Sequence, residues 1–347
     1  TRALGFMGAE APGPSADRLA PRARDTAKIL WQVYVGATVA MAIGYWGAGM
    51  SVFDAFAHAL STAATGGFST YNDSMGEFDS IGIEIVTIVA MLIGGANFAL
   101  HWLFLSKDRL VYFKDHEFLG YLGMVAGATV EIPAMLTCGD AVGGFWESQR
   151  AGAFNVVSLG TSTGFGNAQG PGTPGDIVIW GASPLVILLI LMAVGGMSGS
   201  TAGGVKVIRA RVLAALTHRT IAVARQPRSV VPLKLGRDVV PETVVSQVSV
   251  FMMAWLALVV AGLLTVTALG GDVEASIAGV VGSLGNMGPA FGDAGPTASF
   301  QAAFPTPARL VLAFLMLAGR LELFAVLLML AAPRRTIRNA IPHRHTF

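Results

Sequence analysis

Six long apolar stretches limit the folds open to this chain more than any other feature of its sequence. They cover residues 29–50, 81–105, 118–138, 177–197, 247–269 and 308–332. Each is close to the ~20 residues that an α-helix needs to cross a bilayer. One such stretch could be a buried helix of a soluble protein, but six in one chain make that reading improbable. Charged residues make up only 13% of the sequence, against about 25% in soluble domains. The pattern indicates an all-α integral membrane protein.

The positions of lysine and arginine predict its orientation. Of these 23 residues, 20 lie before residue 29, in 106–117, in 206–238 or after 332. The connecting segments on the opposite side contain only Arg150. The positive-inside rule therefore predicts a multi-pass plasma-membrane protein with both termini of this chain in the cytoplasm. A net charge of +2 gives no reason to expect nucleic acid as a partner, and membrane lipid is the expected surrounding.

Each of the three outer segments contains a short apolar helical pattern that ends in a glycine-rich turn. The turns read "STAATGGFST" (61–70), "SLGTSTGFGN" (158–167) and "GSLGNMGPAFG" (282–292). Each unit therefore reads as span, short re-entrant helix, turn and span. A single turn of this kind would be an ordinary outer loop. Three of them, each between two spans, favour repeated helix–pore-loop–helix units packed around one axis.

Such turns suit a bare cation. Irregular backbone at membrane depth is tolerated only when it is buried in protein or lines a watery cavity. Glycine permits positive φ, so successive carbonyls can point to one side and replace the hydration shell of an ion. The C-terminal end of each short helix adds partial negative charge. The turns therefore predict a selectivity filter made of backbone carbonyls.

A second glycine-rich stretch, "VGGMSGSTAGGVKVIRARVL" (194–213), follows the fourth apolar stretch directly. Its five glycines within 195–204 disfavour a regular helix, at ~1 kcal/mol each relative to alanine. One interpretation is a hinge at the cytoplasmic end of a helix. "GMSG" also fits an intramembrane serine protease, but no histidine in a later span could serve Ser198 as a base. A phosphate-binding loop is excluded because Val205 precedes Lys206 and Val207 follows it.

Arg320 lies within the last apolar stretch, two residues before Glu322. Residues two apart do not share a helix face, so these two side chains are not expected to pair. A charge at this depth usually faces the interior of a bundle. Arg320 is therefore either a packing residue bonded to carbonyls or a positive charge beside the ion path.

The motifs "AEAPGP", "STAATGGFST", "NFALHW", "FNVVSLGTSTGFGN", "GGMSGSTAGGVKVIR" and "GRLELF" resemble the Trk/Ktr/HKT superfamily of potassium transporters, above all the bacterial TrkH type. The resemblance covers nearly the whole chain. In that family four repeats surround a central ion pore, and this sequence matches the second, third and fourth. The resemblance implies potassium uptake across the bacterial inner membrane by a transporter that is not an enzyme. Potassium is the substrate and no cofactor is expected.

The resemblance also assigns residues to the filter and to a gate. The potassium filter would comprise Ala64, Thr65, Gly66, Gly67, Ser162, Thr163, Gly164, Asn286, Met287 and Gly288. The third copy departs from the pattern of the other two, so only its backbone can serve in the same way. The gate would be an intramembrane loop below the filter. Its residues, together with the charges expected beside it, are Gly195, Gly196, Gly199, Gly203, Gly204, Lys206 and Arg320.

The expected organisation follows from the same alignment of motifs. It runs in order as a cytoplasmic link (1–28), the second repeat (29–105), a cytoplasmic loop (106–117), the third repeat with the gating loop 195–204 (118–216), a basic cytoplasmic loop (217–241), the fourth repeat (242–332) and a cytoplasmic tail (333–347). The family works as a homodimer with a cytosolic nucleotide-binding regulatory subunit (TrkA-like). The basic segment 206–238 is its expected contact.

Two alternatives to a potassium pore remain from the sequence. One is a coupled secondary cation transporter driven by sodium or protons, since such proteins also use broken helices at mid-membrane. The other, disfavoured above, is the intramembrane serine protease. Because three filter segments do not close a ring of four, we expect these 347 residues alone to carry no selective potassium current.

Overall fold

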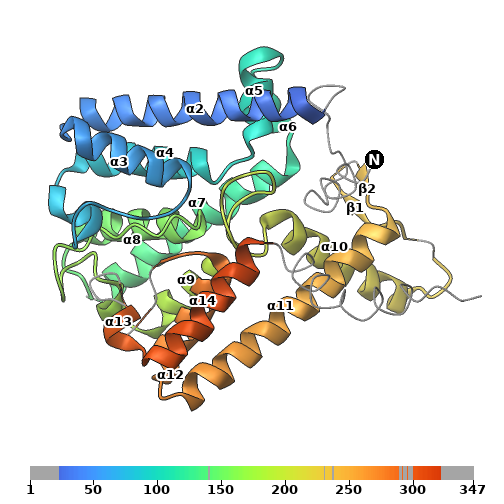
Figure 1. The fold of residues 1–347 in the computed structure, drawn as a ribbon. Helices are drawn as coiled ribbons and strands as arrows, with labels where there is room; N and C mark the ends of the chain where they lie inside the picture. Colours follow the sequence, from blue (N-terminus) through green and yellow to red (C-terminus); the bar gives the residue numbers. More distant parts are fainter. Residues whose placement is uncertain are drawn as a thin grey trace, which may run out of the picture.

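The computed structural model describes residues 23–139, 141–229, 231–236, 238–288, 291, 295 and 300–321. Within these residues the fold is mostly helical (Figure 1), as the apolar stretches predict. The described strands are β1 (Lys234–Leu235) and β2 (Asp238–Val239), which pair antiparallel. Among the described helices, three are long and apolar enough to cross a membrane, or four if one bent pair of helices counts as a single span.

The first group of helices consists of α2 (Ala23–Gly47), α3 (Val52–Ala63) and α4 (Ile81–Gly94), with the short 3-10 helix η1 (Ser74–Phe78) between the last two. Ser51 and Ser80 cap the N-termini of α3 and α4, since their hydroxyls accept backbone N–H groups that the first helical turn leaves free. Both α3 and α4 pack against α2, so the short helix is held beside a full-length one.

The sequence predicts one span over residues 81–105, and that prediction is wrong. It divides into α4 and α5 (Phe98–Ser106), which are bent by 96° from one another. Asn97 caps the start of α5. The backbone groups that the break frees are paired elsewhere: Gly95 accepts the N–H of Met197, and Phe98 donates to Gly199. The kink is therefore stabilised by a distant segment of the chain. The four-residue helix α6 (Val111–Lys114) then leads to the second group.

The second group contains α7 (His116–Cys138), α8 (Phe145–Gly160), α9 (Ala182–Val194) and α10 (Val207–Arg225). The expected stretch 177–197 is shorter as a helix, because Gly181 has a φ of +80° and separates the 3-10 helix η2 (Ile177–Trp180) from α9. α8 packs against both α7 and α9.

The third group contains α11 (Glu242–Ala268), α12 (Val273–Gly285), α13 (Phe300–Ala303) and α14 (Thr306–Arg320). α12 packs against both α11 and α14, so it lies between two apolar helices as α8 lies between α7 and α9. The last predicted stretch extends to 332, and its part from Glu322 onward lies outside the described residues.

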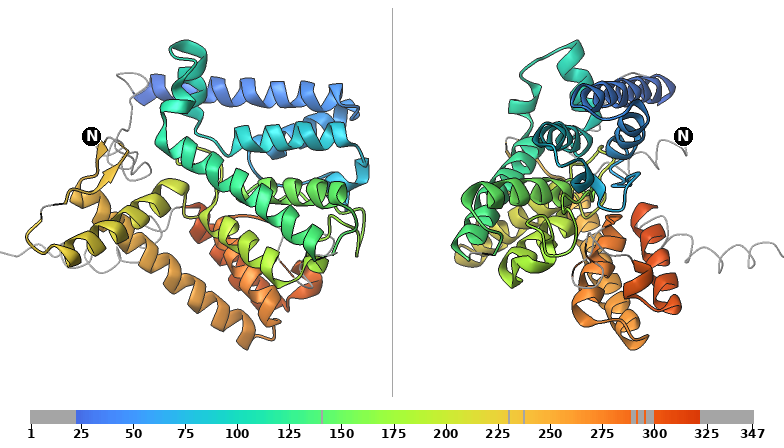
Figure 2. Two further views of the ribbon diagram at one scale, coloured as in Figure 1. Left: turned by 180° about the vertical axis from the view of Figure 1, so that it is seen from behind. Right: turned by 90° about the vertical axis from the view of Figure 1, so that its left-hand side faces the viewer.

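The groups adjoin one another through α4 against α8 and α9 against α12. Seen end-on in the right-hand view of Figure 2, they lie around a zone of non-helical chain. Large apolar side chains such as Trp31, Met253 and Leu264 are more than 60% exposed on the outer surface, as expected for helices surrounded by lipid.

Candidate functional site

The three short helices α3, α8 and α12 end in the same kind of turn. The residues that close them, Thr65, Ser162 and Asn286, have φ angles of +49°, +57° and +54°. In each turn this residue donates its N–H to the carbonyl three positions earlier, and the next residue donates to the carbonyl five positions earlier. This pairing is the Schellman motif of helix C-termini. The three turns therefore share one backbone hydrogen-bond pattern, although their sequences differ.

Two of these turns hold side chains that resist a positive φ. The motif ordinarily uses glycine or asparagine, and Asn286 fits that preference. A non-glycine residue in such a conformation costs on the order of 1–3 kcal/mol, and such strain clusters at functional sites. Thr65 and Ser162 are both buried, at 3% and 0% exposed. The surrounding packing therefore maintains a strained backbone at these two positions.

The predicted filter residues all lie in or beside these turns. They are Ala64, Thr65, Gly66 and Gly67 after α3, Ser162, Thr163 and Gly164 after α8, and Asn286, Met287 and Gly288 at the end of α12. Ala64 is the C-cap residue of α3 and thus precedes the turn proper. Gly67 and Gly164 have φ angles of +66° and +89°, whereas Gly288 is not among the residues of positive φ. The third copy departs from the others in its backbone as well as in its sequence.

The first and second turns contact each other directly. A Cβ atom added to Gly67 would overlap the carbonyl oxygen of Thr163 and lie 2.9 Å from the carbonyl carbon of Gly164. Glycine is thus required at residue 67 by close backbone approach and not only by its φ. The two segments lie side by side, with the C-terminal ends of α3 and α8 directed toward them.

The α9–α10 loop (residues 195–206) contacts the ends of all three short helices. The hydroxyl of Thr201 donates to the carbonyl of Ala63 at the end of α3, at 2.9 Å. The N–H of Gly203 donates to the Ser162 hydroxyl at 2.6 Å. A Cβ on Gly203 would overlap the carbonyl oxygen of Gly285 at the end of α12. The loop therefore lies where the three predicted filter turns meet.

Hydrogen bonds between its two ends close the base of this loop. Val205 and Lys206 donate their N–H groups to the carbonyls of Ala193 and Val194, at 2.9 and 2.8 Å. Val207 donates to Gly196 at 3.0 Å. α10 consequently begins next to the end of α9, and the residues between them form a loop whose two ends lie together. The same three bonds position all five predicted gate glycines, which are Gly195, Gly196, Gly199, Gly203 and Gly204, on this loop.

Both predicted charges of the gate lie against the loop. Lys206 donates its ammonium to the carbonyl of Ala202. Arg320, the last residue of α14, donates Nη1 to the carbonyl of Thr201 at 3.1 Å. The predicted site residues of the gate are thus brought together, and Arg320 contacts the loop rather than a filter turn in the described structure.

Glu117 is a residue of this site that the sequence did not single out. Its Oε1 atom accepts the N–H of Ser198 in the α9–α10 loop at 2.7 Å and the N–H of Ile208 in α10 at 3.2 Å. One carboxylate on α7 therefore holds the loop and the helix that follows it. Little in the sequence indicates this role, since an acidic residue in the first turn of a helix is common.

The geometry around Ser198 does not support a serine nucleophile. His58 contacts the carbonyl of Asp54 and the hydroxyl of Ser69, and His101 contacts Tyr112 and the carbonyl of Ile93. Within the described part of the chain, no histidine is hydrogen bonded to Ser198. Both histidines link neighbouring helices and turns, as expected of structural residues.

The comparisons with known proteins all find proteins of the Trk system. The model of the TrkH family, described as a cation transport protein, matches residues 10–127 and 146–337. The Trk system potassium uptake protein TrkH of Salmonella typhimurium is 36% identical over 323 residues, which are 92% of this chain and 65% of that protein. The potassium uptake protein TrkG of Escherichia coli is 30% identical over 336 residues, 94% of this chain and 66% of that protein.

The crystal structure of the potassium transporter TrkH from Vibrio parahaemolyticus has a similar fold. Its TM-score is 0.83 at 33% identity, and the likeness covers 94% of this chain and 68% of that one. The chain spans 65% of the length of TrkH from Salmonella typhimurium. The family match covers most of the sequence, and the likeness of fold covers 94% of the chain. The chain belongs to the TrkH family of cation transport proteins.

Proposed function

We propose that this chain forms part of a potassium-uptake pore in the bacterial inner membrane. The observation that carries the proposal is the convergence of three identically closed short helices on one region, with the α9–α10 loop seated against all three. Potassium is proposed as the ion because the similar proteins are named as potassium uptake proteins. The pore acts as a transporter and not as an enzyme.

In this proposal the three groups of helices are the second, third and fourth repeats of a four-repeat pore. The turns after α3, α8 and α12 supply backbone carbonyls that replace the hydration shell of the ion. The partial negative charge of three helix C-termini favours a cation at the same point. No carboxylate is needed in the filter. The positive-inside pattern puts the filter turns on the outer side and both termini of this chain in the cytoplasm.

The α9–α10 loop is the gate in this proposal, and regulation reaches it through α10. An ion that has passed the turns meets the loop on its way to the cytoplasm. α10 follows the loop directly and forms the first part of the basic segment 206–238, and Ile208 and Val212 of α10 share an apolar cluster with Val245 and Val248 near the start of α11. We propose that this segment contacts a cytosolic nucleotide-binding subunit of the TrkA type, in an assembly that is a homodimer surrounded by membrane lipid.

The test is ion flux through the protein expressed at its full natural length and reconstituted in liposomes. We expect rubidium uptake that exceeds sodium uptake and persists when neither a proton nor a sodium gradient is imposed. Uptake that requires one of these gradients would instead establish the coupled secondary transporter. Absence of cation uptake, in protein that is folded and inserted, would refute the proposal.

Glu117 gives a prediction for the gate. Replacing Glu117 with glutamine removes the charge that strengthens its two hydrogen bonds, and bonds to charged groups are worth ~1 kcal/mol more than neutral ones. We expect several-fold higher rubidium uptake without the regulatory subunit, and a still larger rise for Glu117→Ala. Glu131 on the same helix is exposed and provides a matched control as Glu131→Gln. Equal uptake by the Glu117 and Glu131 variants would contradict a role for Glu117 in holding the loop.

A further inference from the structure

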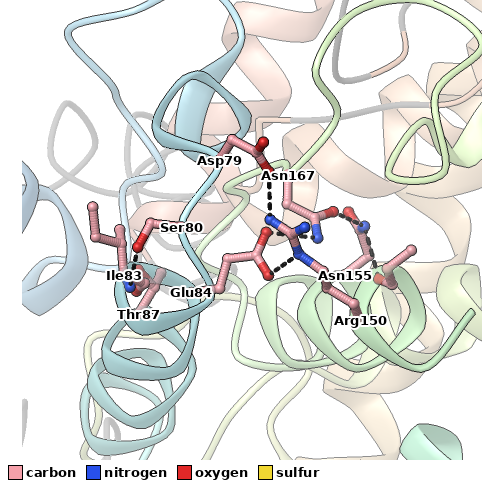
Figure 3. Close-up of polar contacts among 9 residues, drawn as sticks. Asp79, Ser80, Ile83, Glu84, Thr87, Arg150, Asn155 and Asn167 are labelled. Atoms are coloured by element: carbon pink, nitrogen blue, oxygen red, sulfur yellow. Dashed lines mark hydrogen bonds and ion pairs between the residues drawn. The ribbon is translucent and has the colours of Figure 1, made fainter. Parts of the chain in front are cut away.

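A cluster of polar side chains outside the filter turns has no role in the function proposed above. Figure 3 shows Glu84 in the first turn of α4, Arg150 and Asn155 on α8, and Asn167 in the segment that follows the second filter turn. Glu84, Asn155 and Asn167 are 4%, 2% and 7% exposed. Polar groups buried to this extent are costly unless they are paired, so the cluster is a built feature of the interior.

The partners in this cluster satisfy one another. Arg150 donates Nε to Glu84 Oε2 at 2.8 Å and Nη2 to Asp79 Oδ1 at 3.0 Å. The other oxygen of Glu84 accepts Nδ2 of Asn167 at 3.4 Å. Asn155 donates Nδ2 to Oδ1 of Asn167 at 2.9 Å. Asn167 is therefore held from two sides, by the carboxylate of α4 and by the amide of α8.

The cluster joins two groups of helices next to the filter. Asn167 comes three residues after Gly164, while Asp79 and Glu84 belong to the chain that leaves the first filter turn and enters α4. Backbone bonds run parallel to the side-chain cluster, since Met75 donates to the carbonyl of Gly166 at 3.0 Å. The exits of the first and second filter turns are thus fastened to each other.

These contacts lie a few residues beyond a close backbone contact between the first and second filter turns. Gly67 and Thr163 approach each other so closely that no Cβ fits at residue 67. The distance between the first and second filter turns depends on the contacts that hold the two segments of chain leaving those turns. An ion filter discriminates by the positions and field of its carbonyls, so a change at this fastening alters preference among ions even where no side chain of the cluster contacts one.

We propose that Glu84, Arg150 and Asn167 are positioning residues for the filter, which set the spacing of the first and second filter turns and thereby the preference for potassium over sodium. The proposal rests on the pore function proposed above. It extends that function by giving a specificity-determining role to a charge pair that links α4 to α8.

The experiment uses the full-length protein in liposomes and compares rubidium with sodium uptake, each normalised to the amount of folded protein measured by size-exclusion chromatography. We expect Glu84→Gln and Arg150→Gln each to lower the rubidium-to-sodium ratio about tenfold, and the double variant to lower it by less than the product of the two, since contacting residues are not additive. Arg150→Lys keeps the charge but not the planar fork, and we expect an intermediate ratio.

Two further variants keep the outcome interpretable. Lys114→Gln removes the exposed Lys114–Asp108 ion pair at the end of α6 and serves as the control, with an unchanged ratio expected. Asn167→Ala leaves the Glu84–Arg150 pair in place, so it tests the link to the filter even if the charge variants do not fold. We expect it to lower the ratio several-fold.

The outcomes separate the two proposals. If the unmodified protein shows no preference for rubidium, the pore function fails. If the unmodified protein is selective and the folded cluster variants retain its ratio while only their yield falls, the cluster is a packing feature and the positioning role is overturned. A lowered ratio with normal yield in Asn167→Ala supports the role independently of the charge pair.

Discussion

Gly203→Ala is expected to raise rubidium uptake by the full-length protein roughly tenfold without a regulatory subunit, because ~1.4 kcal/mol lost from the closed state changes its population tenfold. A Cβ at this position would overlap the carbonyl oxygen of Gly285. The loop would have to move away from the end of α12, and the 2.6 Å hydrogen bond from Gly203 to Ser162 would be lost with it. The closed arrangement is weakened while the filter turns keep their own hydrogen bonds.

Gly123→Ala on α7 is the matched control, since a Cβ there would have no neighbour within 4 Å among the residues that the structure describes. Its uptake should equal that of the unmodified protein. Uptake through Gly203→Ala should also respond less to the cytosolic subunit. If Gly203→Ala folds normally and its flux and regulation are both unchanged, the loop is a passive connection and the gate lies elsewhere.

The second prediction is that a serine substitution alters ion selectivity more in the second filter turn than in the third. Gly164→Ser should reduce the preference for rubidium over sodium by roughly tenfold, because a side chain forced to positive φ costs on the order of 1–3 kcal/mol or displaces the backbone. Gly164 has a φ of +89°. Gly288→Ser should have a much smaller effect, since Gly288 is not at positive φ and a Cβ there meets no atom of the described residues within 4 Å.

The comparison of these two serine variants is its own control, because the substitution is the same and only the turn differs. The measurement is sodium inhibition of rubidium uptake at equal amounts of reconstituted protein. Equal loss of selectivity at both positions would show that the third turn depends on its glycine as strongly as the second. Unchanged selectivity at Gly164 would remove that turn from the filter.

The sequence was sufficient to predict the short helices and the turns that end them. Their apolar spacing and glycines are local signals, and the glycines at 67 and 164 do adopt positive φ. The same reasoning did not predict the left-handed conformation of Thr65 and Ser162. Local preference disfavours it at both residues, and only tertiary packing maintains it.

The break between α4 and α5 was missed for a related reason. The run from Ile81 to Ser106 is mostly apolar, and composition alone predicts one span. Its interruption is stabilised by hydrogen bonds of Gly95 and Phe98 to the α9–α10 loop, about a hundred residues away in the sequence. The roles of Glu117 and of the Glu84–Arg150 pair could not be predicted from the sequence either, because only the tertiary fold brings their partners near.

The closed base of the α9–α10 loop has a consequence for how this region can change. Val205, Lys206 and Val207 are hydrogen bonded to Ala193, Val194 and Gly196. The end of α9 is therefore joined to the start of α10 without help from the tip of the loop (residues 197–203). The contacts of the tip, such as those of Thr201 with Ala63 and of Gly203 with Ser162, are separate from these bonds. In the proposed pore, a gain or loss of residues between 197 and 203 is therefore expected to alter how well the loop blocks the ion path, while the bonds between α9 and α10 keep the membrane topology. Blocking and topology can thus diverge independently among proteins of this kind.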